Sequence, residues 1–266
     1  YKKYKISTKT SYIQWMDDFY LKRRISMNDS ISLIVHSNPK SPVSEAYRML
    51  RTNIQFSGSD RPIKVVLLTS SGPSEGKTTV CNLAVTFAQS GSRVLIIDAD
   101  LRKPKVHQVF GVENKIGLTN ILVKHEDYKN IALKLPVDNL ELIPSGPIPP
   151  NPSELLSSNV MKNFINAVRE DYDMVIIDSP PIIMVTDAAV LSAITDGTIL
   201  VAASGKVQIN AMKNAKELLE RVNANILGVV LNKIQPQNQD SGYYYYYYYD
   251  ENEVRGKKKW RKLKGN

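Results

Sequence analysis

A glycine-bearing loop that contains a lysine and a threonine has the composition of a phosphate-binding site. The loop, residues 71–79, reads Ser-Gly-Pro-Ser-Glu-Gly-Lys-Thr-Thr, follows an apolar run at 64–70 and precedes a helix-like stretch at 78–89. Strand, tight loop and helix form the context in which the pattern G-x-x-x-x-G-K-[ST] grips phosphate, because backbone N–H groups and the helix dipole face the anion. Lys77 is expected to reach the β- and γ-phosphates of a nucleotide, and the Thr78 hydroxyl suits Mg²⁺.

Two further apolar runs end in aspartates. Residues 93–98 end at Asp98, with Asp100 two residues on, and residues 173–178 end at Asp178. In an open parallel sheet, ligands gather beyond the carboxyl ends of the strands, so these three carboxylates are expected to converge on the phosphates. The alternative for each is a solvated carboxylate that caps a loop.

One more nucleotide contact is expected near the end of the last apolar run. Asn232 lies in Leu-Asn-Lys-Ile-Gln, whose spacing is similar to the N-K-x-D guanine reader, but Gln235 stands where the aspartate is required. A guanine preference is therefore not expected, and Asn232 either faces adenine or caps a loop through its amide. The residues predicted to contact the nucleotide are Gly72, Pro73, Ser74, Glu75, Gly76, Lys77, Thr78, Thr79 and Asn232.

Seven consecutive tyrosines form the second unusual feature of the chain. They make up half of its 14 tyrosines, and Gly242 and Asp250 flank them. Such a run does not suit a packed core element, and its structural alternative is an aggregation-prone aromatic strand. A nucleotide site and a run of phosphorylatable hydroxyls on one chain predict an enzyme that modifies its own tail. The predicted acceptors are Tyr243, Tyr244, Tyr245, Tyr246, Tyr247, Tyr248 and Tyr249.

The combination of motifs resembles a known family. The phosphate loop, Ile-Ile-Asp-Ala-Asp-Leu-Arg at 96–102, the proline-rich segment 145–156, the helix-like segment 45–51 and the tyrosine run are together similar to bacterial tyrosine kinases of capsule and exopolysaccharide assembly, of the Gram-positive type. One departure is Ser74, which stands where the family pattern has glycine. The resemblance implies a P-loop protein-tyrosine kinase that uses ATP, releases ADP and requires Mg²⁺.

Phosphoryl transfer needs in-line positioning and charge neutralisation rather than covalent chemistry by the protein. Lys77 and Mg²⁺, held by Thr78 with Asp100 or Asp178, are expected to supply that neutralisation. Because a tyrosine hydroxyl has a pKa near 10, a carboxylate that accepts its proton assists the reaction, and Asp98 is the candidate base. Asp98 and Asp100 can exchange these roles.

A cluster of charges marks a candidate subunit interface. Glu45, Arg48 and Arg51 are spaced at i, i+3 and i+6, along one side of a helix predicted at 43–56. As a self-contained surface salt bridge the set contributes little. In the resembling family this E-x-x-R-x-x-R helix makes the contact of a ring-shaped homo-oligomer, so the resemblance implies a ring, octameric in that family. It also implies a membrane activator and a cognate tyrosine phosphatase as partners, whereas nucleic acid is not expected.

The order of the elements predicts an α/β fold. Strand–helix alternation implies a mainly parallel, doubly wound sheet with helices on both faces, of the P-loop NTPase type, in a single domain. The predicted strands are 64–70, 93–98, 139–143, 174–178, 198–203 and 226–231, and the predicted helices are 43–56, 78–89, 153–170 and 210–222. Ser153 is the predicted N-cap of its helix.

Charge and composition divide the chain into three parts: a basic aromatic tail at 1–26, a kinase domain at 27–242, and a tail at 243–266 that holds the tyrosines and a basic run. The net charge is +9, and the two basic flanks account for it. Such flanks favour the anionic inner membrane surface over nucleic acid, with a solvated tail as the alternative. Residues 1–26 are either the activating tail of a membrane adaptor, joined natively or by fusion, or a helical segment of the domain. The protein is expected to be cytoplasmic, at the inner face of the cell membrane.

Two other functions fit parts of the sequence. A partition or septum-placement ATPase of the deviant Walker type shares the predicted fold, but such proteins carry a signature lysine five residues before the loop lysine, where this chain has Gly72. A nucleotide-gated scaffold for polysaccharide machinery would use the tyrosines as docking aromatics. Loss of phosphotyrosine on substitution of Lys77 separates a kinase from a scaffold.

Overall fold

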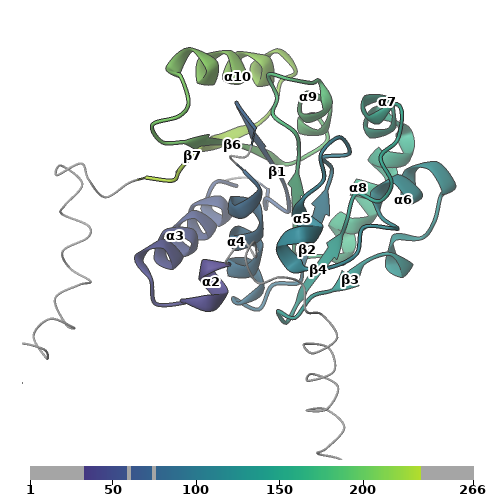
Figure 1. Ribbon diagram of the computed structural model, residues 1–266, viewed down its shortest axis with the longest axis horizontal. Coiled ribbons are helices and arrows are strands. Elements are labelled where there is room, and N and C mark those ends of the chain that lie inside the picture. The colour runs from purple at the N-terminus through teal and green to yellow at the C-terminus, as the bar shows by residue number, and fades with distance from the viewer. Residues whose placement is uncertain (1–32, 59–60, 74–75, 235–266) are drawn as a thin grey trace, which may run out of the picture. The chain divides into compact units, whose positions relative to one another are not determined.

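The computed structural model describes residues 33–58, 61–73 and 76–234. The chain divides into one unit at Tyr1–Ile31 and a second from Ser32 to Asn266, and the described residues belong to the second (Figure 1). The domain boundaries predicted after residues 26 and 242 fall outside the described ranges and stay predictions.

The described residues build one seven-stranded sheet with the order β3-β4-β2-β5-β1-β6-β7. Every pairing is parallel except that of β3 with β4. The strands are β1 (Val65–Ser70), β2 (Val94–Asp98), β3 (Leu133–Lys134), β4 (Leu140–Ile143), β5 (Met174–Asp178), β6 (Gly197–Ala203) and β7 (Ile226–Asn232). All six predicted strands are confirmed, as is the mainly parallel, doubly wound sheet. Strand β3 was not predicted, because two residues are too few to show an alternation of apolar and polar side chains.

Helices cover both faces of this sheet (Figure 1). They are α2 (Ile34–Ser37), α3 (Pro42–Phe56), α4 (Lys77–Ala88), α5 (Val106–Phe110), α6 (Leu118–Lys124), the 3₁₀ turn η1 (Tyr128–Asn130), α7 (Pro152–Ser157), α8 (Asn159–Asp171), α9 (Asp187–Ser192) and α10 (Ile209–Arg221). Helix α3 begins where Ser41 accepts a hydrogen bond from the Ser44 N–H and Pro42 occupies the first turn.

The alternation of side chains along the central strands separates two cores. Val66 and Leu68 of β1 pack with residues of α2, α3, α4 and α5. Val65 and Leu67 point to the other face and pack with residues of α6, α7 and α8. Because successive residues of a strand point to opposite faces, a strand buried on both sides reads as an unbroken apolar run. This is why the central strands were predictable from composition alone.

The prediction of one helix at 153–170 is wrong, because the structure has two helices there, α7 and α8. Ser158 has extended backbone at ψ 158°, which ends α7, and its hydroxyl accepts from Met161 N–H to begin α8. The predicted cap Ser153 lies inside the first turn of α7, after Asn151 and Pro152. Its hydroxyl instead lies 2.7 Å from Oδ1 of Asp187, a contact that sequence spacing does not reveal.

Candidate functional site

Strands β2 and β5 bring two of the predicted aspartates together. Asp98 and Asp178 are register partners at the ends of these parallel neighbours, and Leu68 of β1 is paired with Asp178 on the other side. Because alternate residues of a strand point to the same face of the sheet, both aspartates lie on the face whose apolar residues pack against α4. The carboxylates therefore lie beyond the carboxyl edge of the sheet, beside the loop that leaves β1.

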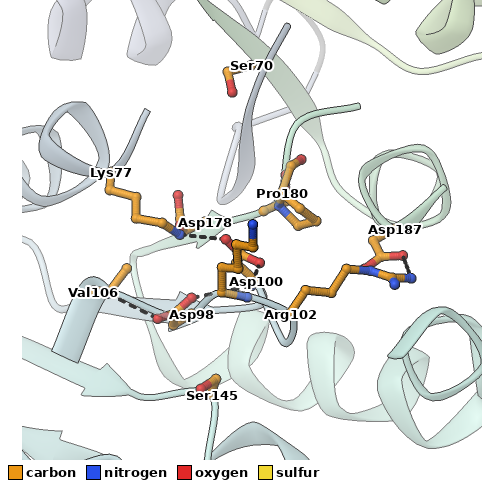
Figure 2. A network of polar contacts seen from close by, with 12 residues as sticks. Ser70, Lys77, Asp98, Asp100, Arg102, Val106, Ser145, Asp178, Pro180 and Asp187 are labelled. Atoms are coloured by element: carbon orange, nitrogen blue, oxygen red, sulfur yellow. Dashed lines mark hydrogen bonds and ion pairs between the residues drawn. The ribbon is translucent and has the colours of Figure 1, made fainter. Parts of the chain in front are cut away.

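Lys77, the first residue of α4, is held between two carboxylates. Its Nζ lies 2.8 Å from Oδ2 of Asp100 and 2.7 Å from Oδ2 of Asp178 (Figure 2). Both aspartates are buried. The structure thus brings the predicted loop lysine and the predicted strand-end acids into one polar cluster.

Asp98 is fully buried and engaged by the backbone. Its Oδ2 accepts from the N–H of Val106 at 3.1 Å, and its Oδ1 accepts from the N–H of Asp100 at 3.3 Å (Figure 2). Burial, followed by the neighbouring Asp178 carboxylate, raises the pKa of Asp98 to about 7. This carboxyl group therefore changes charge close to neutral pH.

Burial and charge act in opposite senses on the partners of this cluster. Burial raises the pKa of Asp178, and the Lys77 ammonium partly offsets that rise. For Lys77, burial alone would lower the pKa, but the carboxylates of Asp178, Asp98 and Asp100 outweigh it and raise the pKa above its ordinary value. The lysine accordingly stays cationic throughout the physiological range.

The predicted Mg²⁺ ligands offer the right kind of atoms. Thr78, Asp100 and Asp178 present hydroxyl and carboxylate oxygens, which Mg²⁺ prefers. Among the described residues, no group of three His, Cys, Asp or Glu side chains is arranged to hold a metal by itself. Mg²⁺ sites commonly use one or two carboxylates and complete the shell with substrate phosphates and water, and the role of these three residues as ligands stays a prediction.

The predicted phosphate loop connects β1 to α4. The Ser70 hydroxyl donates to the carbonyl of Gly72 at 2.7 Å as the chain leaves the strand, Gly76 precedes the first turn of α4, and Thr78 is half-buried. Ser74 and Glu75 of the predicted nucleotide set lie outside the described residues. The loop therefore runs from a buried strand to a buried helix, as the motif requires.

The remaining predicted nucleotide residues pack behind the loop. Asn232, at the end of β7, donates through Nδ2 to the hydroxyl of Thr79 at 3.1 Å, and its Oδ1 accepts from the N–H of Lys233 at 2.7 Å. The Thr79 side chain is buried. The first of these bonds ties the edge strand β7 to α4, and the contact of Asn232 with adenine stays a prediction.

The three charged residues predicted as an interface on α3 do not all contact one another. Arg48 forms an ion pair with Glu45 on the helix surface and donates to the carbonyl of Pro39 at 2.7 Å. Arg51 instead donates to the carbonyl of Thr86 on α4 at 3.1 Å. The interface role of the three residues stays a prediction, and within one subunit Arg51 also joins α3 to α4.

A second cluster beside the site was missed from the sequence. Arg102 makes a two-pronged contact with the carboxylate of Asp187 (Figure 2), and Ser153 contacts both residues. Arg102 belongs to the quoted motif at 96–102, so the motif drew attention to it. Asp187 lies on the short helix α9, for which no periodic pattern exists, and nothing in the sequence pairs it with Arg102.

The tyrosines Tyr243–Tyr249 and the basic flanks lie outside the described residues, so their predicted roles rest on sequence. No helix in the described ranges is both long and apolar enough to span a bilayer.

Known proteins give this arrangement a family. The family described as AAA domain matches residues 64–227. Tyrosine-protein kinase YwqD of Bacillus subtilis (strain 168) is 46% identical over 214 residues, which cover 80% of this chain and 90% of that protein.

Solved structures agree with this match. The chimerical protein CapA2B2 has a TM-score of 0.73 at 41% identity, over 76% of this chain and 89% of that one. The kinase domain of Escherichia coli tyrosine kinase ETK has a TM-score of 0.75 at 31% identity, over 83% of this chain and 88% of that one. The resemblance drawn from the sequence motifs is confirmed, and the chain belongs to the family of bacterial tyrosine-protein kinases.

Proposed function

We propose that this kinase transfers the γ-phosphoryl group of ATP to the tyrosines at 243–249 of a neighbouring copy, and that this reaction regulates capsular or exopolysaccharide polymerisation and export. The observation that carries the proposal is the position of Lys77 between Asp100 and Asp178, directly behind the loop that leaves β1. A cation fixed among acids at the carboxyl edge of a parallel sheet suits a phosphoryl group whose charge must be neutralised.

The chemistry follows from the roles of these side chains. Lys77 would contact the β- and γ-phosphates, and Thr78 with Asp100 and Asp178 would hold Mg²⁺, which would neutralise phosphate charge when bound. The tyrosine oxygen forms a bond to the γ-phosphorus as the bond from phosphorus to the β–γ bridging oxygen breaks, and ADP leaves. The phenolic proton passes to a carboxylate.

Asp98 is the proposed base because its pKa of about 7 gives a carboxylate able to accept a proton at neutral pH. Asp100 is the alternative, since both oxygens of Asp98 already accept backbone hydrogen bonds. The pH dependence of Asp98→Asn and Asp100→Asn variants distinguishes the two.

Assembly and partners complete the proposal. Glu45, Arg48 and Arg51 form the contact of a homo-oligomeric ring, and a membrane activator and a cognate tyrosine phosphatase act on it. The name of the similar chimera CapA2B2 indicates a protein composed of two parts, in keeping with residues 1–26 as an activator tail joined to the kinase. Such a tail, together with the basic run near residue 260, would hold the kinase at the cytoplasmic face of the membrane.

The test is an anti-phosphotyrosine assay on purified protein incubated with ATP and Mg²⁺. Lys77→Met should abolish the signal, whereas Lys129→Met, which removes another ion-paired lysine, should leave it unchanged. Mass spectrometry should locate phosphate at residues 243–249. Wild-type protein that gains no phosphotyrosine, but keeps its partners regardless of Lys77, would be a scaffold and would contradict the proposal.

A further inference from the structure

The guanidinium of Arg102 lies against a buried carboxylate from a different segment of the chain. Its Nε is 2.9 Å from Oδ2 of Asp187, and its Nη2 is 3.0 Å from Oδ1 (Figure 2). Asp187 is fully buried at the first residue of α9. A charge removed from water needs a well-oriented partner, and two parallel N–H···O bonds fix both groups in direction as well as distance.

Ser153 adds a third segment to this contact. Its hydroxyl lies 2.7 Å from Oδ1 of Asp187 and 3.0 Å from Nη2 of Arg102. Ser153 lies in the first turn of α7, so the loop after β2, the start of α7 and the start of α9 meet at one point. We call these three residues the Arg102 cluster.

The Arg102 cluster reaches the loop lysine through the backbone. Arg102 lies between Asp100 and Lys103, and the N–H of Lys103 donates to Oδ1 of Asp100 at 3.0 Å. The other oxygen of Asp100 lies 2.8 Å from Nζ of Lys77. The carboxylate that faces the lysine is therefore also bonded to the backbone directly after Arg102.

The opposite side of the cluster connects to Asp178. Asp187 lies on the segment that continues from Asp178, and this segment is fixed to β1 by the Thr69 hydroxyl, which donates to the carbonyl of Pro180 at 2.9 Å. The Arg102–Asp187 pair thus joins the two segments whose carboxylates hold the loop lysine. The strand pairing of β2 and β5 ends at Asp98 and Asp178, and one further backbone bond, from the Ala99 N–H to the Asp178 carbonyl at 2.9 Å, follows it.

We infer that the Arg102 cluster is a positioning device that sets the separation of the Asp100 and Asp178 carboxylates. The inference deepens the proposed function and rests on it for the catalytic readout. Groups that orient metal-binding carboxylates typically change activity or metal affinity by about 10- to 100-fold when they are removed. The side chains of the cluster act through Asp100 rather than on the phosphates.

The first test separates kcat from KM. Arg102→Ala and Asp187→Asn should lower kcat by about 10- to 100-fold, with a smaller rise in KM for ATP because the loop that grips the phosphates is intact. Arg102→Lys keeps the charge without the two-pronged geometry and should be intermediate. Ser153→Thr keeps the hydroxyl and should exceed Ser153→Ala in kcat.

A matched control exists at the other end of the same strands. Arg93 and Asp173 form an exposed ion pair at 3.4 Å, just before β2 and β5. Arg93→Ala should leave kcat unchanged. A fall in kcat for Arg93→Ala as large as that for Arg102→Ala would mean that any loss of an inter-strand ion pair suffices, and would overturn the inference.

A binding cycle tests the inference without turnover. The affinity for a fluorescent ADP is titrated with and without Mg²⁺ in wild type, Arg102→Ala, Asp100→Asn and the double variant. Arg102→Ala should reduce the gain in affinity due to Mg²⁺, and should have no further effect once Asp100 is Asn. If Arg102→Ala costs the same Mg²⁺-dependent affinity in wild type and in Asp100→Asn, the cluster does not act through Asp100 and the inference is overturned. A lowered melting temperature with kcat and binding unchanged would show a structural role only and would also overturn it.

The two proposals fail in different ways. If wild-type protein binds the nucleotide and the cycle behaves as expected, but no phosphotyrosine forms, the proposed function falls and the positioning role stands. If phosphotyrosine forms normally in Arg102→Ala, the positioning role falls and the proposed function stands.

Discussion

The Nζ atom of Lys77 lies 2.7 Å from Oδ2 of Asp178, where the first turn of α4 meets the last residue of β5. Asp178 is buried between its neighbours on β1 and β2. The ammonium is therefore both a phosphate ligand in the proposed reaction and the counter-ion of a carboxylate that the fold has removed from water.

The Lys77→Met variant should consequently lose stability as well as activity. Removing one partner of a buried ion pair costs about 3–5 kcal/mol, because the other charge is left uncompensated. Without the ammonium, the pKa of Asp178 rises further, and a group with a raised pKa lowers stability as pH increases. Urea unfolding without nucleotide should therefore find a larger loss at about pH 8 than at about pH 5.5.

Lys129→Met is the matched comparison, because Lys129 pairs with Asp171 at 2.8 Å where both side chains are largely exposed. That variant should lose much less stability than Lys77→Met, because exposed ion pairs contribute little. Equal losses for the two lysines, or a loss in Lys77→Met that does not vary with pH, would contradict the buried counter-ion role.

Asp98 should impose a pH dependence near neutrality. With a pKa of about 7 in the free protein, it accepts a proton from tyrosine only when ionised, so kcat/KM should rise with pH through about 7 and then level off. Asp98→Asn should lower kcat by roughly 100-fold or more and remove this rise. If Asp100→Asn removes the rise and Asp98→Asn keeps it, Asp100 is the base.

The same group should shape the stability curve. Because the pKa of Asp98 is raised in the folded protein, the folded state binds more protons than the unfolded state between about pH 4 and about pH 7. Asp98 should therefore make stability fall as pH rises across this window. The decrease should be smaller in Asp98→Asn, as measured by thermal unfolding at a series of pH values.

Exchanging Glu45 and Arg48 tests the interface separately from folding. The double variant Glu45→Arg/Arg48→Glu keeps an ion pair at i, i+3 within α3 but reverses the charges that a neighbouring subunit would meet. Light scattering should give monomers, with a melting temperature only a little below that of wild type, because the exposed bond from Arg48 to the Pro39 carbonyl is also lost. Arg51 is left in place because its bond to the Thr86 carbonyl supports the monomer. Rings of unchanged mass in the swapped variant would exclude this contact.

Asp196 should matter for stability and not for catalysis. Its Oδ2 accepts from the N–H groups of Lys64 and Val65 at 3.0 and 2.8 Å, and its Oδ1 accepts from Arg169 at 3.0 Å. These bonds lie at the amino end of β1, away from the phosphate loop. Asp196→Ala should cost about 2 kcal/mol in chemical unfolding, with kcat per folded molecule unchanged.

Asp196→Asn keeps one oxygen acceptor and should lose less stability than Asp196→Ala. A fall in kcat comparable to that for Asp98→Asn would show that the amino edge of the sheet influences the reaction.

Transfer between copies can be tested by mixing two inactive partners. Lys77→Met supplies intact tyrosines, and a variant with phenylalanine at 243–249 supplies an intact site. Phosphotyrosine should appear on Lys77→Met only in the mixture, and the initial rate per enzyme in wild type should rise with protein concentration. If no phosphotyrosine forms on Lys77→Met in the mixture, and the wild-type rate per enzyme does not change with concentration, each chain phosphorylates itself.

The strands and their acids were predictable because burial on both faces leaves a plain signature. Runs such as Val94–Asp98 and Met174–Asp178 are apolar throughout and end in a carboxylate, and a parallel sheet aligns such ends at one edge. The helix that follows the loop was predictable from the glycine–lysine pattern. Together these features located Lys77, Asp98, Asp100 and Asp178 in one site.

What could not be predicted depends on contacts between segments far apart in the chain. The break between α7 and α8 at Ser158 leaves the apolar pattern almost undisturbed, and α5 and α9 are too short for a helical period. The bonds of Arg102 to Asp187 span 85 residues, and no local rule relates the two. Likewise, spacing along α3 could not reveal that Arg51 turns toward Thr86.

The bond between Asn232 and Thr79 fixes the point from which the chain continues toward the tyrosines. Ten residues lie between Asn232 and Tyr243, and the eleven residue steps from one to the other give a contour of at most about 40 Å at 3.3–3.6 Å per residue. In the proposed reaction, the chain that leads to the acceptor tyrosines therefore starts beside the nucleotide loop of the same subunit. The length of that connection, more than any sequence around the tyrosines, limits which active sites the hydroxyls can visit.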